Sequence, residues 1–252
     1  MILSFFSLLG SRIVNAIILL VMVPILISLI GLDGYGKYAL FQIYSTYVLA
    51  VFSGFTTYFS RQSALIIGGR RAEIVYLNKI EKIINLHFFL VILFSLTSFL
   101  VLLITWKFTF WNINFASLCA LSLFIFSKLV NSVLETQLGA NEKFNYYSII
   151  ESVRTFFRAL YSVLFGFAYG LEGCIWAFAT AEISVIGIFF FIKHPYFSHL
   201  LSKINLKSIF KARTILRKII LERAFVIFVR DASLNNGINA WILDYDKILV
   251  NV

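Results

Sequence analysis

Long apolar stretches separated by short polar ones run along most of the chain. Each is close to the roughly 20 residues that an α-helix needs to cross the hydrocarbon core of a bilayer. In lipid the backbone polar groups must bond within their own segment, so the stretches are predicted to be helices rather than strands. Six spans are predicted, at residues 13–30, 39–59, 83–104, 115–134, 148–169 and 173–192.

The last sixty residues follow a different pattern, which divides the chain into three predicted parts. Residues 1–192 form a six-helix transmembrane bundle. Residues 193–220 form a basic amphipathic linker, in which Lys203, Lys207 and Lys211 share one helix face suited to the anionic inner leaflet of a membrane. Residues 221–252 mix apolar and polar positions and are predicted to be a partial seventh helix.

The composition agrees with an all-α polytopic membrane bundle. Hydrophobic residues make up 60% of the chain and charged residues 13%, whereas a soluble domain carries about 25% charged residues. The net charge of +10 does not indicate nucleic acid, because the positive residues cluster in two of the connections between spans. The positive-inside rule places these two basic loops and the N-terminus in the cytoplasm.

Several charged residues nevertheless lie inside predicted spans. Glu151, Arg154 and Arg158 are spaced three and four residues apart, so they lie on one face of the fifth helix. Counted from the start of that helix, Arg158 lies about 15 Å deep, near the middle of the bilayer. Glu182 in the sixth helix comes out nearly level with Arg158, and Lys128 in the fourth helix close to the level of Arg154. The stripe is therefore expected to face the interior of the bundle, away from lipid.

Two interpretations of these charges stay open at the level of sequence. In the first interpretation the charged residues form structural ion pairs, such as Arg158 with Glu182 and Lys128 with Glu151. Alternatively, Arg154 and Arg158 bind an anionic ligand, with Glu151, Glu182 and Lys128 as charge partners in a cavity. No metal site or cofactor is predicted: Cys119 and Cys174 are interpreted as buried structural thiols. His87 is interpreted as a polar residue with satisfied hydrogen bonds.

Three segments resemble bacterial polysaccharide flippases, the O-antigen translocases of the multidrug/oligosaccharidyl-lipid/polysaccharide exporter superfamily. They are VPILISLIGLDGYGKYALFQIYSTYVLAVFSGFTTYFSRQSA, ETQLGANEKFNYYSIIESVRTFFRALYSVL and WILDYDKILVNV, which are similar to the family's first two helices, its link between helices four and five, and its seventh helix. The resemblance implies two six-helix bundles around a central cavity in the bacterial inner membrane. It implies flipping of undecaprenyl-diphosphate-linked oligosaccharide units for surface polysaccharide synthesis, beside a polysaccharide polymerase and chain-length machinery. Arg154 and Arg158 fall in the helix that carries the family's cationic residues.

The resemblance also implies that the chain is an N-terminal fragment. Residues 221–252 would then start a second bundle that is missing, and the transport activity of the chain alone is in doubt. Two other functions are weighed against flipping. A membrane glycan polymerase or acyltransferase would need a group of His, Asp or Glu residues at a water-facing end of the bundle, and the outer connections are nearly bare of them, so no enzyme is predicted. A cation-coupled drug exporter of the same superfamily would favour carboxylates in its cavity, and the arginines of the fifth helix argue instead for an anion.

Overall fold

The computed structural model describes residues 2–68, 73–106, 114–141, 144–191 and 229–236 of the chain, and all of these segments are helical apart from the cap residues Asn114 and Asn141. Four long helices follow one another along the chain: α1 (Ile2–Gly68), α2 (Glu73–Trp106), α3 (Phe115–Ala140) and α4 (Phe144–Phe191). Each contains a stretch long and apolar enough to cross a membrane. The predicted class, an all-helical membrane bundle, is confirmed.

The division into six separate spans and a seventh helix is not what the structure shows. The predicted connection at residues 31–38 is helical except at Gly31, so two predicted spans merge into α1. The last two spans merge in the same way into α4, which is non-helical only at Gly170. The predicted linker 193–220 lies outside the described residues, as do residues 221–228 and 237–252 of the predicted seventh helix.

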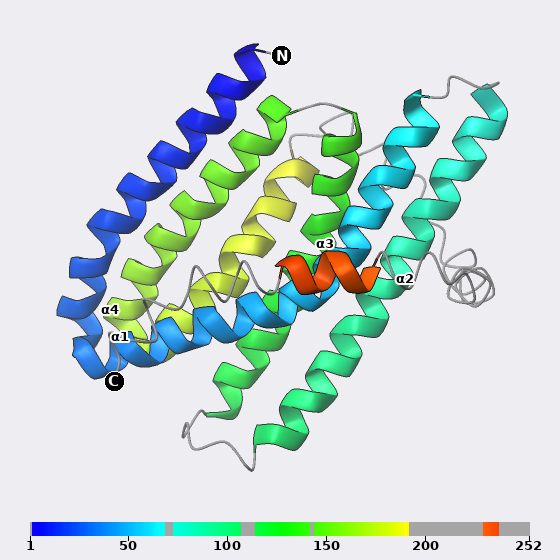
Figure 1. The fold of residues 1–252 in the computed structure, drawn as a ribbon. Coiled ribbons are helices and arrows are strands. Elements are labelled where there is room, and N and C mark those ends of the chain that lie inside the picture. The colour runs from blue at the N-terminus through cyan, green and yellow to red at the C-terminus, as the bar shows by residue number, and fades with distance from the viewer. Residues whose placement is uncertain (1, 69–72, 107–113, 142–143, 192–228, 237–252) are drawn as a thin grey trace.

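Two glycines let α1 and α4 turn back on themselves. Gly31 has φ 73° and ψ 170°, and Gly170 has φ 59° and ψ −137°. A side chain is strongly disfavoured at such positive φ values, so only glycine adopts them readily. In Figure 1 the ribbon of α1 descends from the N-terminus and then turns toward the far side of the bundle, and α4 descends and returns beside itself. The bundle is therefore built from roughly antiparallel segments.

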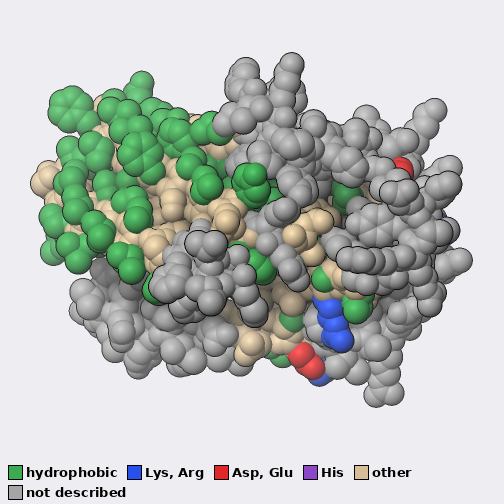
Figure 2. Space-filling model, turned by 90° about the horizontal axis from the view of Figure 1, so that it is seen from above, with side chains coloured by type: hydrophobic (Ala, Val, Ile, Leu, Met, Phe, Trp, Pro, Cys, Tyr) green, Lys and Arg blue, Asp and Glu red, His purple; other side chains and the backbone are tan. Residues whose placement is uncertain are grey.

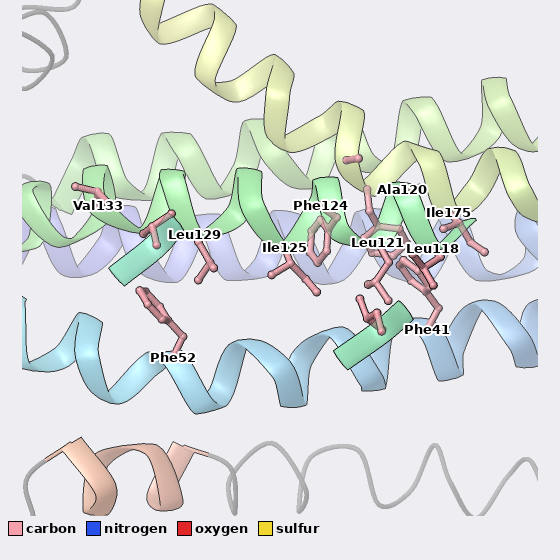
Figure 3. Packing of buried hydrophobic residues seen from close by; sticks show 14 of the residues in the cluster. Phe41, Phe52, Leu118, Ala120, Leu121, Phe124, Ile125, Leu129, Val133 and Ile175 are labelled. Atoms are coloured by element: carbon pink, nitrogen blue, oxygen red, sulfur yellow. The ribbon is translucent and has the colours of Figure 1, made fainter. Parts of the chain in front are cut away.

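The centre of the bundle is a packed apolar core. Phe41 and Phe52 project from the second half of α1 toward α3, where they meet side chains that include Leu121 and Leu129 (Figure 3). Hydroxyl groups in α1 bond to the helix's own carbonyls, as Thr46 and Ser45 both do to Gln42. Such bonds satisfy polar side chains where no water is at hand.

The outside of the bundle carries many apolar side chains. Leu20, Leu32 and Phe167 are among many large hydrophobic side chains that are mostly exposed. Figure 2 shows such side chains gathered over one end of a face of the molecule. A soluble monomer rarely exposes so many, whereas contact with lipid removes the penalty for exposing them.

His87 corrects one expectation from the sequence. Its side chain is fully buried and lies between the rings of Phe52 and Phe59, with ring centroids 5.8 and 4.7 Å away. Within the described part of the chain, neither ring nitrogen has a hydrogen-bond partner. The prediction that its hydrogen bonds are satisfied is therefore wrong: the imidazole packs as a third aromatic ring.

A short helical segment, residues 229–236, lies across the second half of α1 (Figure 1). The Ser233 hydroxyl donates to the carbonyl of Val51 at 2.9 Å, and the amide of Asn236 donates to the Ser53 hydroxyl at 2.8 Å. A Cβ on Gly54 would collide with the Ser233 hydroxyl and with the carbonyl of Val229. The contact is thus close enough to require glycine at position 54.

We expect Gly54→Val to displace this segment from α1, because its side chain would occupy space held by backbone atoms. The measurement is the yield of a short thiol cross-link between cysteines at positions 53 and 236, in a chain from which Cys119 and Cys174 have been removed. Gly187→Val is the matched control, since a Cβ at Gly187 meets no atom within 4 Å. An equal cross-link yield in both variants would show that Gly54 does not set this contact.

Candidate functional site

The charged residues predicted inside the bundle come together between α3 and the two halves of α4. Arg158 precedes Gly170 by as many residues as Glu182 follows it, so the turn at Gly170 brings the two side chains to the same level. Two further glycines let the halves approach. A Cβ on Gly173 would collide with the backbone of Phe165, and one on Gly166 would lie 2.8 Å from the sulfur of Cys174.

Arg154 is the centre of this charged cluster. Its Nε lies 2.9 and 3.0 Å from the two carboxylate oxygens of Glu182, and its Nη1 lies 2.5 Å from Glu151 Oε1. Its Nη2 donates to the carboxylate of Glu135. The Arg154 side chain is only 3% exposed. All three guanidinium nitrogens are thus engaged by carboxylates from three helical segments.

Lys128 completes the cluster on the side of α3. Its Nζ lies 3.4 Å from Glu135 Oε1 and 4.0 Å from Glu151 Oε1. The side chains of Lys128, Glu135 and Glu151 are partly exposed, unlike that of Arg154. The lysine therefore shares its two carboxylates with Arg154, and these three residues are more accessible than Arg154.

Arg158 is held more loosely than Arg154. Its Nη2 lies 3.5 Å from Glu182 Oε1, too far for a strong hydrogen bond. Its Nε is buried and has no hydrogen-bond partner among the residues that the structure describes. Its guanidinium carbon lies 4.7 Å from the centre of the Phe178 ring and 5.9 Å from that of Phe124. The side chain is 27% exposed. Arg158 is thus the arginine of the cluster with donors left to offer.

The carboxylate of Glu182 is the most enclosed charge of the site. Its side chain is 0% exposed. Asn131 of α3 donates to Glu182 Oε2 at 2.7 Å and to the Glu182 carbonyl at 3.2 Å. Asn131 therefore fixes the carboxylate between the two arginines, and it ties α3 to the second half of α4.

The cluster is balanced in charge. Three cations, Lys128, Arg154 and Arg158, face three carboxylates, those of Glu135, Glu151 and Glu182. Such balance lets ionised groups stay inside an apolar bundle. Both ion pairs expected from sequence, Arg158 with Glu182 and Lys128 with Glu151, are among the contacts. An anionic ligand at this site therefore competes with these carboxylates for the three cations.

Glu135 and Asn131 belong to the site but were not predicted as members of it. The signal was present: Lys128, Asn131 and Glu135 are spaced three and four residues apart, the same spacing as Glu151, Arg154 and Arg158. Glu135 fell just beyond the predicted end of the fourth span at residue 134.

Comparisons of the chain with family models, with curated proteins and with solved structures found no match.

Proposed function

We propose that the chain forms the first bundle of a flippase, which moves undecaprenyl-diphosphate-linked oligosaccharide units across the bacterial inner membrane. The observation that carries the proposal is Arg158. Among the described residues it is a guanidinium inside an apolar bundle with a long ion pair, an unpartnered Nε and a partly exposed side chain. Intramembrane ionisable residues of this kind mark ligand pathways, and the forked guanidinium suits phosphate oxygens.

The proposal includes a topology. α1 and α4 each turn back at a glycine, so each is proposed to cross the membrane twice, which gives six crossings together with α2 and α3. The N-terminus is then on the cytoplasmic side, with Arg61 at the same side of the membrane. Residues 229–236 are proposed to belong to a seventh helix that begins a second bundle. The proposed partners of the flippase are a polysaccharide polymerase and chain-length proteins.

Within this proposal the two arginines have different roles. Arg154 is engaged by three carboxylates, so its predicted contact with the ligand requires that one of them be displaced. Arg158 needs to leave only Glu182, which keeps Arg154 and Asn131 as partners. The diphosphate is therefore proposed to meet Arg158 first, with Lys128 as the second accessible cation.

The test is binding of undecaprenyl diphosphate to the purified chain in nanodiscs, with undecaprenol as the uncharged comparison. A hydrogen bond to a charged group contributes about 1.5–3 kcal/mol, so Arg158→Gln is expected to weaken diphosphate binding by about 10- to 100-fold. Undecaprenol binding is expected to be unchanged. Lys37→Gln is the control, because Lys37 forms an exposed ion pair with Asp33 in another part of the bundle.

Two results would contradict the proposal. One is equal binding of undecaprenyl diphosphate and undecaprenol by the unmodified chain. The other is a diphosphate affinity that is the same in Arg158→Gln and Lys37→Gln. Arg158→Lys separates charge from shape: an ammonium keeps the charge but not the fork, so it is expected to retain part of the affinity.

A further inference from the structure

The surroundings of Arg158 have the composition of a site for a free organic cation. The ring of Phe178 lies under the guanidinium at 4.7 Å, the ring of Phe124 lies at 5.9 Å, and Glu182 Oε1 lies 3.5 Å from Nη2. Aromatic faces combined with a carboxylate are the means by which proteins hold cationic ligands. Here the cation belongs to the protein itself.

The walls of this cradle, defined as Phe124, Phe178 and Glu182, are held in place without help from Arg158. Phe178 packs against Tyr38 and Phe41 of α1 and against Phe124 of α3, with centroids 5.3, 5.4 and 5.5 Å apart. Glu182 keeps its contacts with Arg154 and Asn131. A cradle supported from three helices is expected to keep its shape when the guanidinium leaves.

The cradle also has an acceptor that Arg158 does not use fully. Glu182 Oε1 is buried and lies 2.9 Å from Arg154 Nε, whereas Arg158 Nη2 approaches it only to 3.5 Å. The Arg158 side chain is 27% exposed, so part of it reaches the surface of the bundle on the side from which it enters the cradle. A planar cation that entered from this side would find two ring faces and an acceptor.

We propose that the Phe124–Phe178–Glu182 cradle is a cation-binding site in its own right, which takes a free guanidinium-type cation whenever Arg158 leaves it. The inference goes beyond the proposed flippase function, since it concerns a cation rather than the phosphorylated lipid. In the unmodified chain the Arg158 side chain fills the cradle and excludes free guanidinium-type cations. A ligand that draws Arg158 away opens the site.

The experiment measures binding of methylguanidinium to Arg158→Ala in nanodiscs by calorimetry and by the shift in thermal unfolding. Saturable binding in the millimolar range is expected, together with a higher unfolding temperature. The unmodified chain is expected to bind at least tenfold more weakly, because its own arginine competes. Adding Glu182→Gln or Phe178→Leu to Arg158→Ala is expected to weaken binding at least tenfold, whereas adding Lys37→Ala leaves it unchanged.

Three outcomes would overturn the proposal: no saturable binding to Arg158→Ala, equal binding to the unmodified chain, or binding indifferent to the Glu182 and Phe178 changes. Should Arg158→Ala fail to fold, Arg158→Met serves as the second variant, and recovery of folding by methylguanidinium supports the site. Failure of both variants with and without methylguanidinium contradicts it. Methylguanidinium binding together with absent diphosphate binding would reject the flippase proposal and leave the cradle standing.

Discussion

Arg154→Met is expected to lower the free energy of unfolding of the bundle by about 3–5 kcal/mol, the range observed when one partner of a buried ion pair is removed. Methionine fills much of the volume of arginine. The decrease in the free energy of unfolding is therefore caused by the loss of the charge rather than by a cavity. Without the guanidinium, Glu182 stays fully enclosed with only the distant Arg158 and the amide of Asn131. Glu135 and Glu151 then depend on Lys128.

The measurement is reversible unfolding in mixed micelles with rising dodecyl sulfate, followed by helical circular dichroism. Lys37→Met is the control, because the ion pair of Lys37 with Asp33 is exposed, at 54% and 85%, and such pairs contribute about 0–1 kcal/mol. The double variant Arg154→Met/Glu182→Gln tests the cause. If stranded charge destabilises Arg154→Met, neutralising Glu182 recovers part of the loss. Equal stability of Arg154→Met and Lys37→Met would contradict the central role given to Arg154.

The sequence predicts the site better than it predicts the ends of the helices. The rise of an α-helix is constant, so counting residues from a helix end gives the depth of each charge. That count placed Arg158 nearly level with Glu182, and Lys128 close to the level of Arg154. The structure has the contact of Arg158 with Glu182, and it brings Lys128 to two carboxylates that Arg154 also contacts. Apolar length identified the membrane class for a similar reason, because the thickness of the bilayer fixes it.

Neither residue counting nor apolar length predicts the form of the turns at Gly31 and Gly170. The GLDGYGKYAL stretch has the glycines of an ordinary loop, yet one residue at positive φ is enough to redirect the chain. Helix resumes at Leu32, and the 2.8 Å ion pair between Asp33 and Lys37 supports its first turn. Whether a glycine ends a helix or only bends the chain depends on what the two arms pack against, and a single sequence does not show that.

The polar end of α3 was missed because hydropathy ends a span where polar residues begin. Glu135 and Gln137 continue the helix to Ala140, held by contacts with other segments. Glu135 accepts from Arg154, and Gln137 donates to the Ser63 hydroxyl of α1 at 3.1 Å. Glu and Gln are themselves good helix formers, so the helix continues past the end of the apolar stretch. Its contact with Arg154 makes Glu135 a member of the charged cluster.

Phe178→Ala is expected to destabilise the bundle by about 3 kcal/mol, the lower end of the range for truncating a buried phenylalanine. The side chain is 1% exposed, and its ring contacts Tyr38 and Phe41 of α1 and Phe124 of α3. Apolar transfer contributes little in a membrane, since lipid is as apolar as the core. What is lost is packing between three helices, and the cavity that remains cannot close while those helices hold their other contacts.

Phe167→Ala is the matched control for this prediction. It makes the same change in the same helix, but the Phe167 side chain is 84% exposed, so its loss is expected to alter the free energy of unfolding by less than about 0.5 kcal/mol. Phe178→Leu fills part of the space but removes the ring face under Arg158, and it should therefore fall between the two in stability. Equal unfolding of Phe178→Ala and Phe167→Ala would mean that the three helices do not depend on this ring, and that the cradle of Arg158 lacks the rigid wall on which its proposed cation site relies.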